Sequence, residues 1–551
     1  MKRNFKKIYT KAIAALMCAT LAGNADAAVI EHIADRYIIN VDQMDLNGDE
    51  SLMDLLMMVP DVVSIDGKGT IDNELGKWAV RIDNVNISVN TAMFLKNTKA
   101  KEIKKIKVCV NPGIMKGCGG LKTVIDINYR KKEEGTSGKA AIEGDSYGNA
   151  ELFVNNTIDK ENLTFRTFVM GALEHKKNDE GIKSHAAEED VKMHLNWDIT
   201  SQDNLELFAA QNFVRERETN EPALFNRFYH VEGVYTRDLG NGAYGLAQAI
   251  GTYSHDNTVG KKTQAVDPAL IFEFGFPFIS KNVYMTTGIE TGYSAFTDGV
   301  TDFTDKSRYE DGYIQVDWNL GKFNFSIGDR IRIENYWYSK PQYAMNFEKS
   351  FTNNHFTATS WVNINDNNIV QATFARRFLG SLQTVDGFYC NVKDIYKRPA
   401  YISELRYTYQ KQDFNLMGIV KNTRQEWDNA THNNALMIGA SSYMHMGALR
   451  LTAGVNYFHM QHNVSGCKEY NNYVDLKLAP QVSLEGWRFT STMLYSSRKT
   501  TFERPANFYA DVAVSKELNE KWLVEAKFHD MAGQHYGNRA VSIGATYYWG
   551  K

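Results

Sequence analysis

Residues 449–457 read Leu449-Arg450-Leu451-Thr452-Ala453-Gly454-Val455-Asn456-Tyr457, so apolar and polar side chains alternate along the segment. The same period of two recurs at 313–318 and at 522–529. Successive side chains of a β-strand point to opposite faces of the sheet, so each segment is predicted to be a strand with one apolar and one polar face.

Short polar turns separate such strands at a regular interval. They are Asp159-Lys160-Glu161-Asn162, Ser201-Gln202-Asp203-Asn204, Gly240-Asn241-Gly242, Ser280-Lys281-Asn282, Gly321-Lys322, Asn365-Asp366-Asn367-Asn368, Lys411-Gln412-Asp413, Met446-Gly447, Glu485-Gly486 and Asn519-Glu520-Lys521. Neighbouring turns are about 40 residues apart, which fits two strands of about 10–12 residues and one longer loop. One strand precedes the first turn and one follows the last, so the pattern predicts an antiparallel transmembrane β-barrel of about 22 strands.

A soluble propeller is the alternative, because its blades also repeat about every 40–45 residues. A blade needs four short strands, however, whereas each repeat here holds two long ones. The composition favours strands, with 29 Tyr and 29 Phe but only 9 Pro. The barrel is therefore the predicted fold.

The first 27 residues have the pattern of a signal peptide. Basic residues from Lys2 to Lys7 precede an apolar stretch from Ala12 to Ala22, and Ala25-Asp26-Ala27 fits the cleavage rule. No later run is long and apolar enough for a spanning helix. An exported chain of this kind is expected in the outer membrane of a Gram-negative bacterium, since only helices and closed barrels satisfy every backbone group in lipid. The net charge of −3 gives no case for a nucleic-acid partner.

Near the C-terminus the sequence reads Ser542-x-Gly544-x-x-Tyr547-x-Trp549, followed by Gly550 and Lys551. This spacing resembles the signal that the barrel-assembly machinery recognises on the last strand of outer-membrane proteins. The alternating Val541, Ile543 and Ala545 are expected to face lipid together with both aromatic residues.

Residues 28–132 have a different pattern and are predicted to form a small mixed α/β domain before the barrel at 133–551. Leu52, Leu55, Leu56 and Val59 have helical spacing after Ser51, and Pro60 ends that helix. Strands are predicted at 78–82, 106–110 and 124–128.

Four segments of this domain resemble the plug of TonB-dependent receptors. Residues 51–62 resemble the plug helix that ends in Val-Pro-Gly-Val, and 80–85 resemble the strand ending in Ile-Asp-Gly-Val, with Arg81 and Asp83. Residues 103–108, followed by Pro112, resemble the strand before Arg-Gly-Pro, and 124–127 resemble the closing Val-Ile-Asn-Ile strand. The plug positions singled out are Pro60, Arg81, Asp83, Pro112, Gly113, Gly117, Gly119 and Gly120.

Several residues depart from that pattern. Asp61, Asn84 and Asn111 stand where the family has glycine, and Val110 stands where it has arginine. The resemblance therefore implies a divergent, compact member of the family, with the α/β plug inside the barrel lumen.

The resemblance also implies function: a receptor that binds an unknown small ligand at the cell surface and imports it with TonB-type energy coupling. Coupling needs an extended N-terminal segment that adds as a strand to a periplasmic energy transducer. The candidate is Val29-Ile30-Glu31-His32-Ile33. The alternative is a non-energised structural or partner-anchoring barrel, which short external loops favour.

Other constellations indicate no enzyme, metal site or cofactor. The acidic run at 45–49 lacks the glycine and the last glutamate of a calcium loop. His445, His459 and His462 are too far apart along a strand pair to converge. Cys109 and Cys118 flank a hairpin, where a disulfide, two thiols or a soft-metal site with Met115 all remain open.

Overall fold

The structure is a computed structural model of the chain. It describes residues 30–33, 36–41, 51–56, 78–83, 85–87, 94–95, 97–109, 123–130, 134–177, 183–218, 223–258, 261–299, 303–340, 345–378, 399–411, 413–426, 432–464, 467–497, 507–531 and 539–550. Among these residues, no helix has the length and apolar character needed to cross a membrane.

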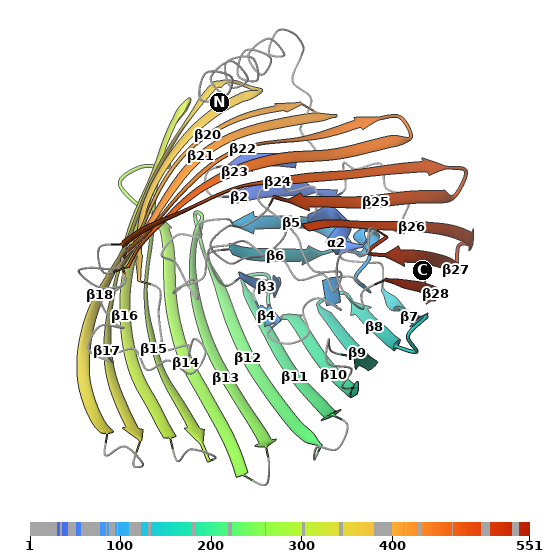
Figure 1. Ribbon diagram of the computed structural model, residues 1–551. Helices are drawn as coiled ribbons and strands as arrows, with labels where there is room; N and C mark the ends of the chain where they lie inside the picture. The colour runs from blue at the N-terminus through green and yellow to red at the C-terminus, as the bar shows by residue number, and fades with distance from the viewer. Residues whose placement is uncertain are drawn as a thin grey trace.

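The larger part of the fold is a closed antiparallel barrel of 22 strands, β7 to β28 (Figure 1). Its first half comprises β7 (Gly135–Asp145), β8 (Ala150–Lys160), β9 (Leu163–Lys177), β10 (Lys183–Asp198), β11 (Asp203–Glu218), β12 (Leu224–Gly240), β13 (Ala243–Thr258), β14 (Lys261–Pro277), β15 (Val283–Asp298), β16 (Phe303–Leu320) and β17 (Phe323–Lys340). The second half comprises β18 (Met345–Asn365), β19 (Asn368–Phe378), β20 (Pro399–Lys411), β21 (Phe414–Glu426), β22 (His432–Met446), β23 (Leu449–Val464), β24 (Cys467–Leu484), β25 (Trp487–Ser496), β26 (Asn507–Asn519), β27 (Trp522–His529) and β28 (Ala540–Trp549).

All ten predicted turns join consecutive strands, and the predicted strand number is confirmed. Glycine supplies the left-handed backbone in several turns, as at Gly321 (φ 75°) and Gly447 (φ 56°). The predicted strand length was wrong for much of the barrel: β18 has 21 residues and β16 has 18. A strand needs only about 9–11 residues to cross a bilayer, so these strands continue past it and occupy chain that the prediction assigned to loops.

The alternation read from the sequence separates the two faces of the wall. Along β23, Arg450 and Thr452 are buried toward the lumen, whereas Val455 is 43% exposed on the outer face. Ile314 on β16 is likewise 45% exposed between the buried Tyr313 and Gln315. The outer surface is therefore apolar and the lumen polar, as a lipid-embedded barrel requires.

The barrel closes where β28 pairs with β7. Trp549 lies opposite Gly138, and a Cβ atom on Gly138 would lie 2.5 Å from the Trp549 ring. The Tyr547 ring lies between those of Trp549 and Trp522, tilted to both, at centroid distances of 6.3 Å and 4.9 Å. The C-terminal aromatics thus cover the seam from outside, and Ser542 is buried on the lumen side.

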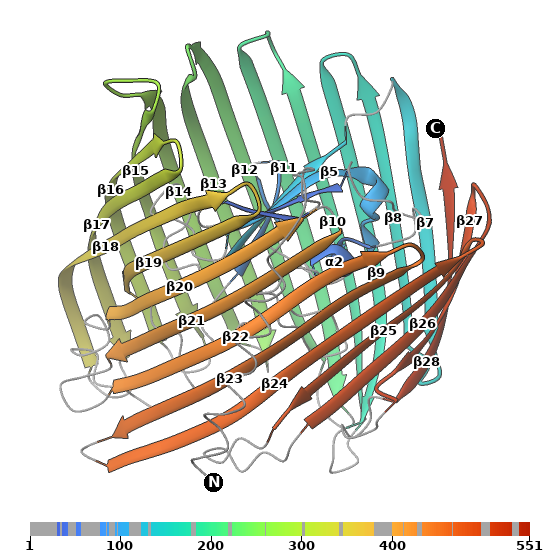
Figure 2. The same ribbon diagram turned by 90° about the horizontal axis from the view of Figure 1, so that it is seen from above.

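A six-stranded sheet lies inside the ring of barrel strands (Figure 2). Its spatial order is β1 (Ile30–Ile33), β2 (Arg36–Asn40), β5 (Ile103–Cys109), β6 (Thr123–Tyr129), β3 (Trp78–Ile82) and β4 (Val85–Ile87). The helix α2 (Leu52–Leu56) and the 3₁₀ turn η2 (Ala100–Glu102) accompany the sheet. The predicted mixed domain and its three predicted strands are therefore present, and the domain occupies the lumen.

Candidate functional site: the contacts between plug and lumen wall

The apolar core of the plug continues into the barrel wall. The helix residues Leu52, Leu55 and Leu56 have no exposed surface, because they pack on the plug sheet. The same cluster includes these wall residues: Phe153, Phe168, Met170, Ala172, Met417, Ile419 and Tyr443. A polar lumen wall thus carries an apolar patch where the plug docks, and burial of both surfaces favours docking.

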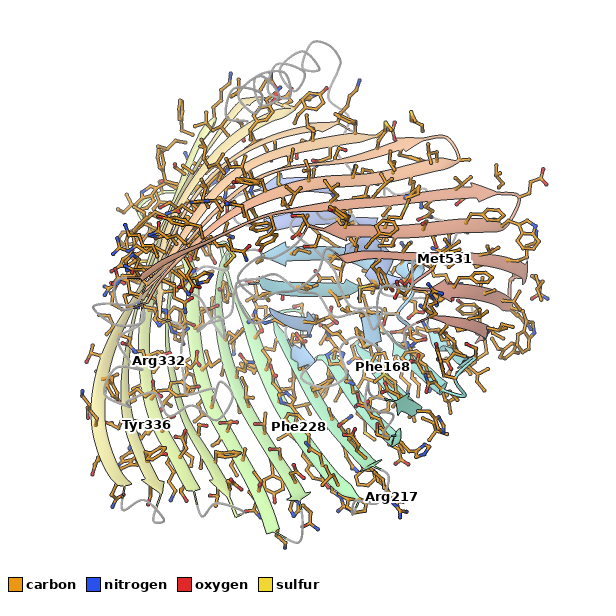
Figure 3. The ribbon with its side chains drawn as sticks, in the orientation of Figure 1. Phe168, Arg217, Phe228, Arg332, Tyr336 and Met531 are labelled. Carbon is orange, nitrogen blue, oxygen red and sulfur yellow. The ribbon has the colours of Figure 1, made fainter. Side chains whose placement is uncertain are left out.

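The centre of this dock is an aromatic pair. Phe168 of β9 (Figure 3) and Phe94 of the plug are both fully buried. Their rings meet edge to face, with centroids 5.4 Å apart. A smaller cluster joins Val85 of β4 to Phe208 of β11 and Val234 of β12. The plug is thereby held against β8, β9, β11, β12, β21 and β22.

A polar junction lies beside the apolar dock, at Asp83. Its backbone has φ 50°, a left-handed conformation that aspartate and asparagine tolerate better than most residues. Its Oδ2 atom lies 3.3 Å from Nη1 of Arg166 on β9, and the same nitrogen is 3.4 Å from Nδ1 of His194. His194 Nε2 lies 3.6 Å from a Glu206 carboxylate oxygen. A chain of polar groups therefore runs from the plug across β9, β10 and β11.

Burial raises the pKa of Asp83 above its usual range, although the nearby Arg166 charge opposes that shift. Burial also raises the pKa of Tyr129, and the Arg166 guanidinium, which lies 4.4 Å from the Tyr129 ring centroid, opposes that shift. A carboxyl with a raised pKa in the docked plug favours docking most when it is protonated. That contribution is complete below the ordinary aspartate pKa and is lost as the pH rises through the raised value.

Replacing Arg166 with methionine is expected to weaken plug docking by about 2 kcal/mol at pH 8, and by clearly less at pH 5. The variant leaves Asp83 buried beside no cation, so Asp83 must take a proton or stay charged at a cost. The measurement is the urea concentration at which single barrels in a planar bilayer begin to conduct ions, taken at both pH values.

The double variant D83N/R166M is the control, because His194 and Glu206 are present in both proteins. The weakening of plug docking in this double variant should be the same at pH 5 and pH 8. An equal loss at the two pH values in R166M itself would contradict the role given to Asp83.

A second polar junction lies at η2. Lys139 Nζ of β7 donates to Glu102 Oε1 at 2.6 Å, and Asn155 of β8 donates to the other carboxylate oxygen at 3.3 Å. Lys101 Nζ lies 3.7 Å from the centroid of the Tyr548 ring. These contacts anchor the plug at the seam where the barrel closes.

The lumen wall of β13 to β17 carries a network of its own. Glu273 accepts hydrogen bonds from Tyr244 and Tyr313, each at 2.8 Å. Arg330 donates to Glu290 at 2.6 Å and also binds Asp311. Arg332, on the same strand β17 as Tyr336 (Figure 3), donates to both oxygens of Asp311, at 2.8 and 2.7 Å. The network links five neighbouring strands and presents aromatic and charged groups to the lumen.

The predicted site residues are only partly within the described chain. Ile30–Ile33 of the coupling candidate form β1, and Val29 lies outside the described residues. Arg81 lies 4.0 Å from Asp126 within the plug sheet, and Asp83 forms the junction above. Pro60, Pro112, Gly113, Gly117, Gly119 and Gly120 lie outside the described residues, so their roles stay predictions.

The structure describes some of the cysteines and histidines that were candidates for a disulfide or a metal site. Cys109 is buried on β5 and Cys118 lies outside the described residues, so their pairing stays untested. His459 and His462 contact different asparagines, Asn472 and Asn433, and His445 lies 3.4 Å from Asp413. Within the described ranges, no three His, Cys, Asp or Glu side chains gather as a metal site would require.

Sequence reasoning missed Arg166, Glu102 and Lys139. Alternation identifies Arg166 and Lys139 as lumen-facing, but it gives no partner across the lumen. The apolar lumen residues Phe168 and Met170 were the available signal, because they interrupt an otherwise polar inner face.

No protein-family model matches the sequence, and no curated protein matches it. Solved structures do match its fold. The ferric-catecholate import receptor Fiu of E. coli K12, in its closed form, is 10% identical with a TM-score of 0.69, over 96% of this chain and 99% of that one.

The copper transporter OprC is 9% identical with a TM-score of 0.71, over 94% of this chain and 100% of its own. The siderophore receptor PirA of Pseudomonas aeruginosa is 13% identical with a TM-score of 0.67, over 94% and 100%. Together with the plug sheet inside 22 strands, these matches show that the chain has the fold of the TonB-dependent receptors of Gram-negative outer membranes.

Proposed function

We propose that the protein is an outer-membrane receptor that binds a ligand at the cell surface and imports it through the plugged barrel with TonB-type energy coupling. The observation that carries the proposal is the plug itself, which occupies the lumen and meets the wall at two apolar clusters and two polar junctions. Such a plug would block the passive flow of solutes through the barrel. When the plug moves, the polar groups at the two junctions can replace their present partners with water.

The position of β1 supports coupling. Among the described strands, β1 pairs with β2 alone and forms one edge of the plug sheet. An edge strand presents unpaired backbone groups, to which a strand of another protein can add. A partner that captured Ile30–Ile33 would pull directly on the sheet through β2.

The register also supports the direction of the pull. Ile30 pairs with Ile39, which in turn pairs with Ile106, the middle residue of β5. The preceding η2 turn contacts Lys139 and Tyr548, close to the barrel end that carries the short turns and the C-terminus. Short turns face the periplasm in bacterial barrels, and the energy transducer is there.

The ligand classes to test first come from the structures with the same fold, which include receptors for ferric catecholates and a copper transporter. Tyrosine, arginine and carboxylate side chains on β13 to β17 supply the polar lumen surface along which such a ligand would pass.

Deleting residues 28–33 is expected to abolish uptake while leaving the barrel folded. Cells producing the full chain or the deletion would be compared for uptake of ferric catecholate and of copper. A scrambled 28–33 segment is the matched control for length and composition. Uptake that continues after the deletion would contradict energised import and favour a passive or anchoring barrel.

A further inference from the structure

The outer face of β9 to β12 carries a group of basic side chains near one end of the barrel. This end, the loop end, is opposite to the one that carries the ten short turns and the C-terminus. On these strands the buried residues Phe168, Asp190, Ala210 and His230 face the lumen, so residues of odd number face outward. Outward positions at the loop end include His175, His185, Arg215, Arg217 and Arg227, all of which are exposed. We call these five residues the basic patch.

The strand register brings the patch together. His175 lies opposite His185, and His185 lies opposite Arg217, so the three form one row across β9, β10 and β11. The rings of the two histidines are 4.8 Å apart. Figure 3 shows Arg217 at the rim, at the end of β11.

Arg215 and Arg227 occupy the next two rows, supported by aromatic rings. The guanidinium of Arg215 lies 5.5 Å from the Phe225 ring, and that of Arg227 lies 5.4 Å from the Phe213 ring. The two rings stack on each other at 6.1 Å. Stacking holds guanidinium groups in place while their N–H donors stay available.

The patch begins where the lipid-facing band ends. In the next row toward the short turns, Tyr229 and Tyr253 stack at 6.1 Å, as in an aromatic interface girdle. The following row contains Val231, which is 59% exposed on the same outer face. The basic patch therefore lies at the height of lipid headgroups on the loop side of the membrane.

The charge of the patch is not balanced within the described chain. Glu189 is the single acidic residue among its described outward neighbours on β9 to β12, and Arg215, Arg217 and Arg227 make no ion pair with another described residue. On β16, by contrast, the exposed Arg308 pairs with Glu310 at 2.7 Å. Three exposed arginines beside an aromatic girdle, with no ion pair to a described residue, form a surface that suits an anionic ligand.

We propose that the basic patch binds the phosphate groups of a phosphorylated glycolipid in the outer leaflet of the membrane. Arginine forks match phosphate oxygens by two parallel hydrogen bonds, and basic side chains at a membrane surface attract anionic headgroups. The acyl chains would lie on the apolar face below, against Tyr229 and Val231. The proposal rests on the outer-membrane location of the proposed function, but not on import.

The test uses the full chain purified in neutral detergent, with binding of bisphosphorylated lipid A measured by native mass spectrometry. The triple variant R215Q/R217Q/R227Q should bind this lipid at least tenfold more weakly. R308Q is the matched control, since it removes an exposed outward arginine that is already paired, and its binding should equal that of the wild type. Unheated gel migration confirms that each variant has a folded barrel.

Two further arms identify the group recognised. The same lipid without its phosphates should bind the wild type at least tenfold more weakly, and inorganic phosphate at equal concentration should not compete. Equal binding by the triple variant, or equal binding of the dephosphorylated lipid, would overturn the proposal. Competition by inorganic phosphate would indicate a free-phosphate site and would also overturn it. Uptake measured in parallel separates this outcome from failure of the import proposal.

Discussion

Replacing Arg330 with methionine is expected to lower the barrel's free energy of unfolding by about 3–5 kcal/mol. The Arg330 side chain is 2% exposed and is shared between Asp311 (0% exposed) and Glu290 (8% exposed). Methionine fills a similar volume but carries no charge. The carboxylates of Asp311 and Glu290 then lose the positive charge that offsets their own in a desolvated wall. The cost of an uncompensated buried charge exceeds that of a lost surface pair several times over.

Urea unfolding in detergent micelles, followed by tryptophan fluorescence and by unheated gel migration, measures this loss. R308M is the control: its partner Glu310 is 58% exposed, so a change below about 1 kcal/mol is expected. Arg332 keeps two hydrogen bonds to Asp311 in the variant, so most of the loss should come from Glu290. Equal losses in R330M and R308M would show that the network on β13 to β17 does not brace the wall.

Replacing Phe94 with alanine is expected to destabilise the docked plug by about 3–5 kcal/mol. Its ring is fully buried against Phe168, so the variant loses buried apolar area and leaves a cavity between plug and wall. Amide hydrogen exchange in β5 and β6 measures plug stability, while the barrel strands serve as an internal reference.

Phe325→Ala is the matched control, because Phe325 is 39% exposed on the outer face of β17. Its exchange in β5 and β6 should equal that of the wild type. If F94A also left plug exchange unchanged, the apolar dock would not hold the plug, and the polar junctions alone would have to do so.

Periodicity predicted the barrel well, because lipid outside and polar groups inside impose a period of two on every strand. The ten turns were readable for a related reason: each contains glycine or a few polar residues, as at Gly240-Asn241-Gly242. Strand ends on the loop side were not readable, since strands that project past the bilayer no longer need an apolar outer face. Arg217 and His175 lie on such extensions.

The contacts between plug and wall could not be predicted from the sequence. Asp83 and Arg166 are 83 residues apart along the chain, and no local pattern pairs a plug carboxylate with a particular wall strand. The plug resemblance placed Asp83 at the end of a strand, and the structure adds the partner that gives it a role. The role proposed for β1 depends in the same way on a partner outside the chain.

Binding to the periplasmic domain of TonB tests the central claim, energised import, most directly. The full chain in detergent, the 28–33 deletion and the scrambled segment would each be incubated with that domain and recovered by pull-down. The account predicts that the full chain retains the domain and that both altered proteins lose it. No binding to the full chain, or equal binding to all three, would contradict energy coupling through β1.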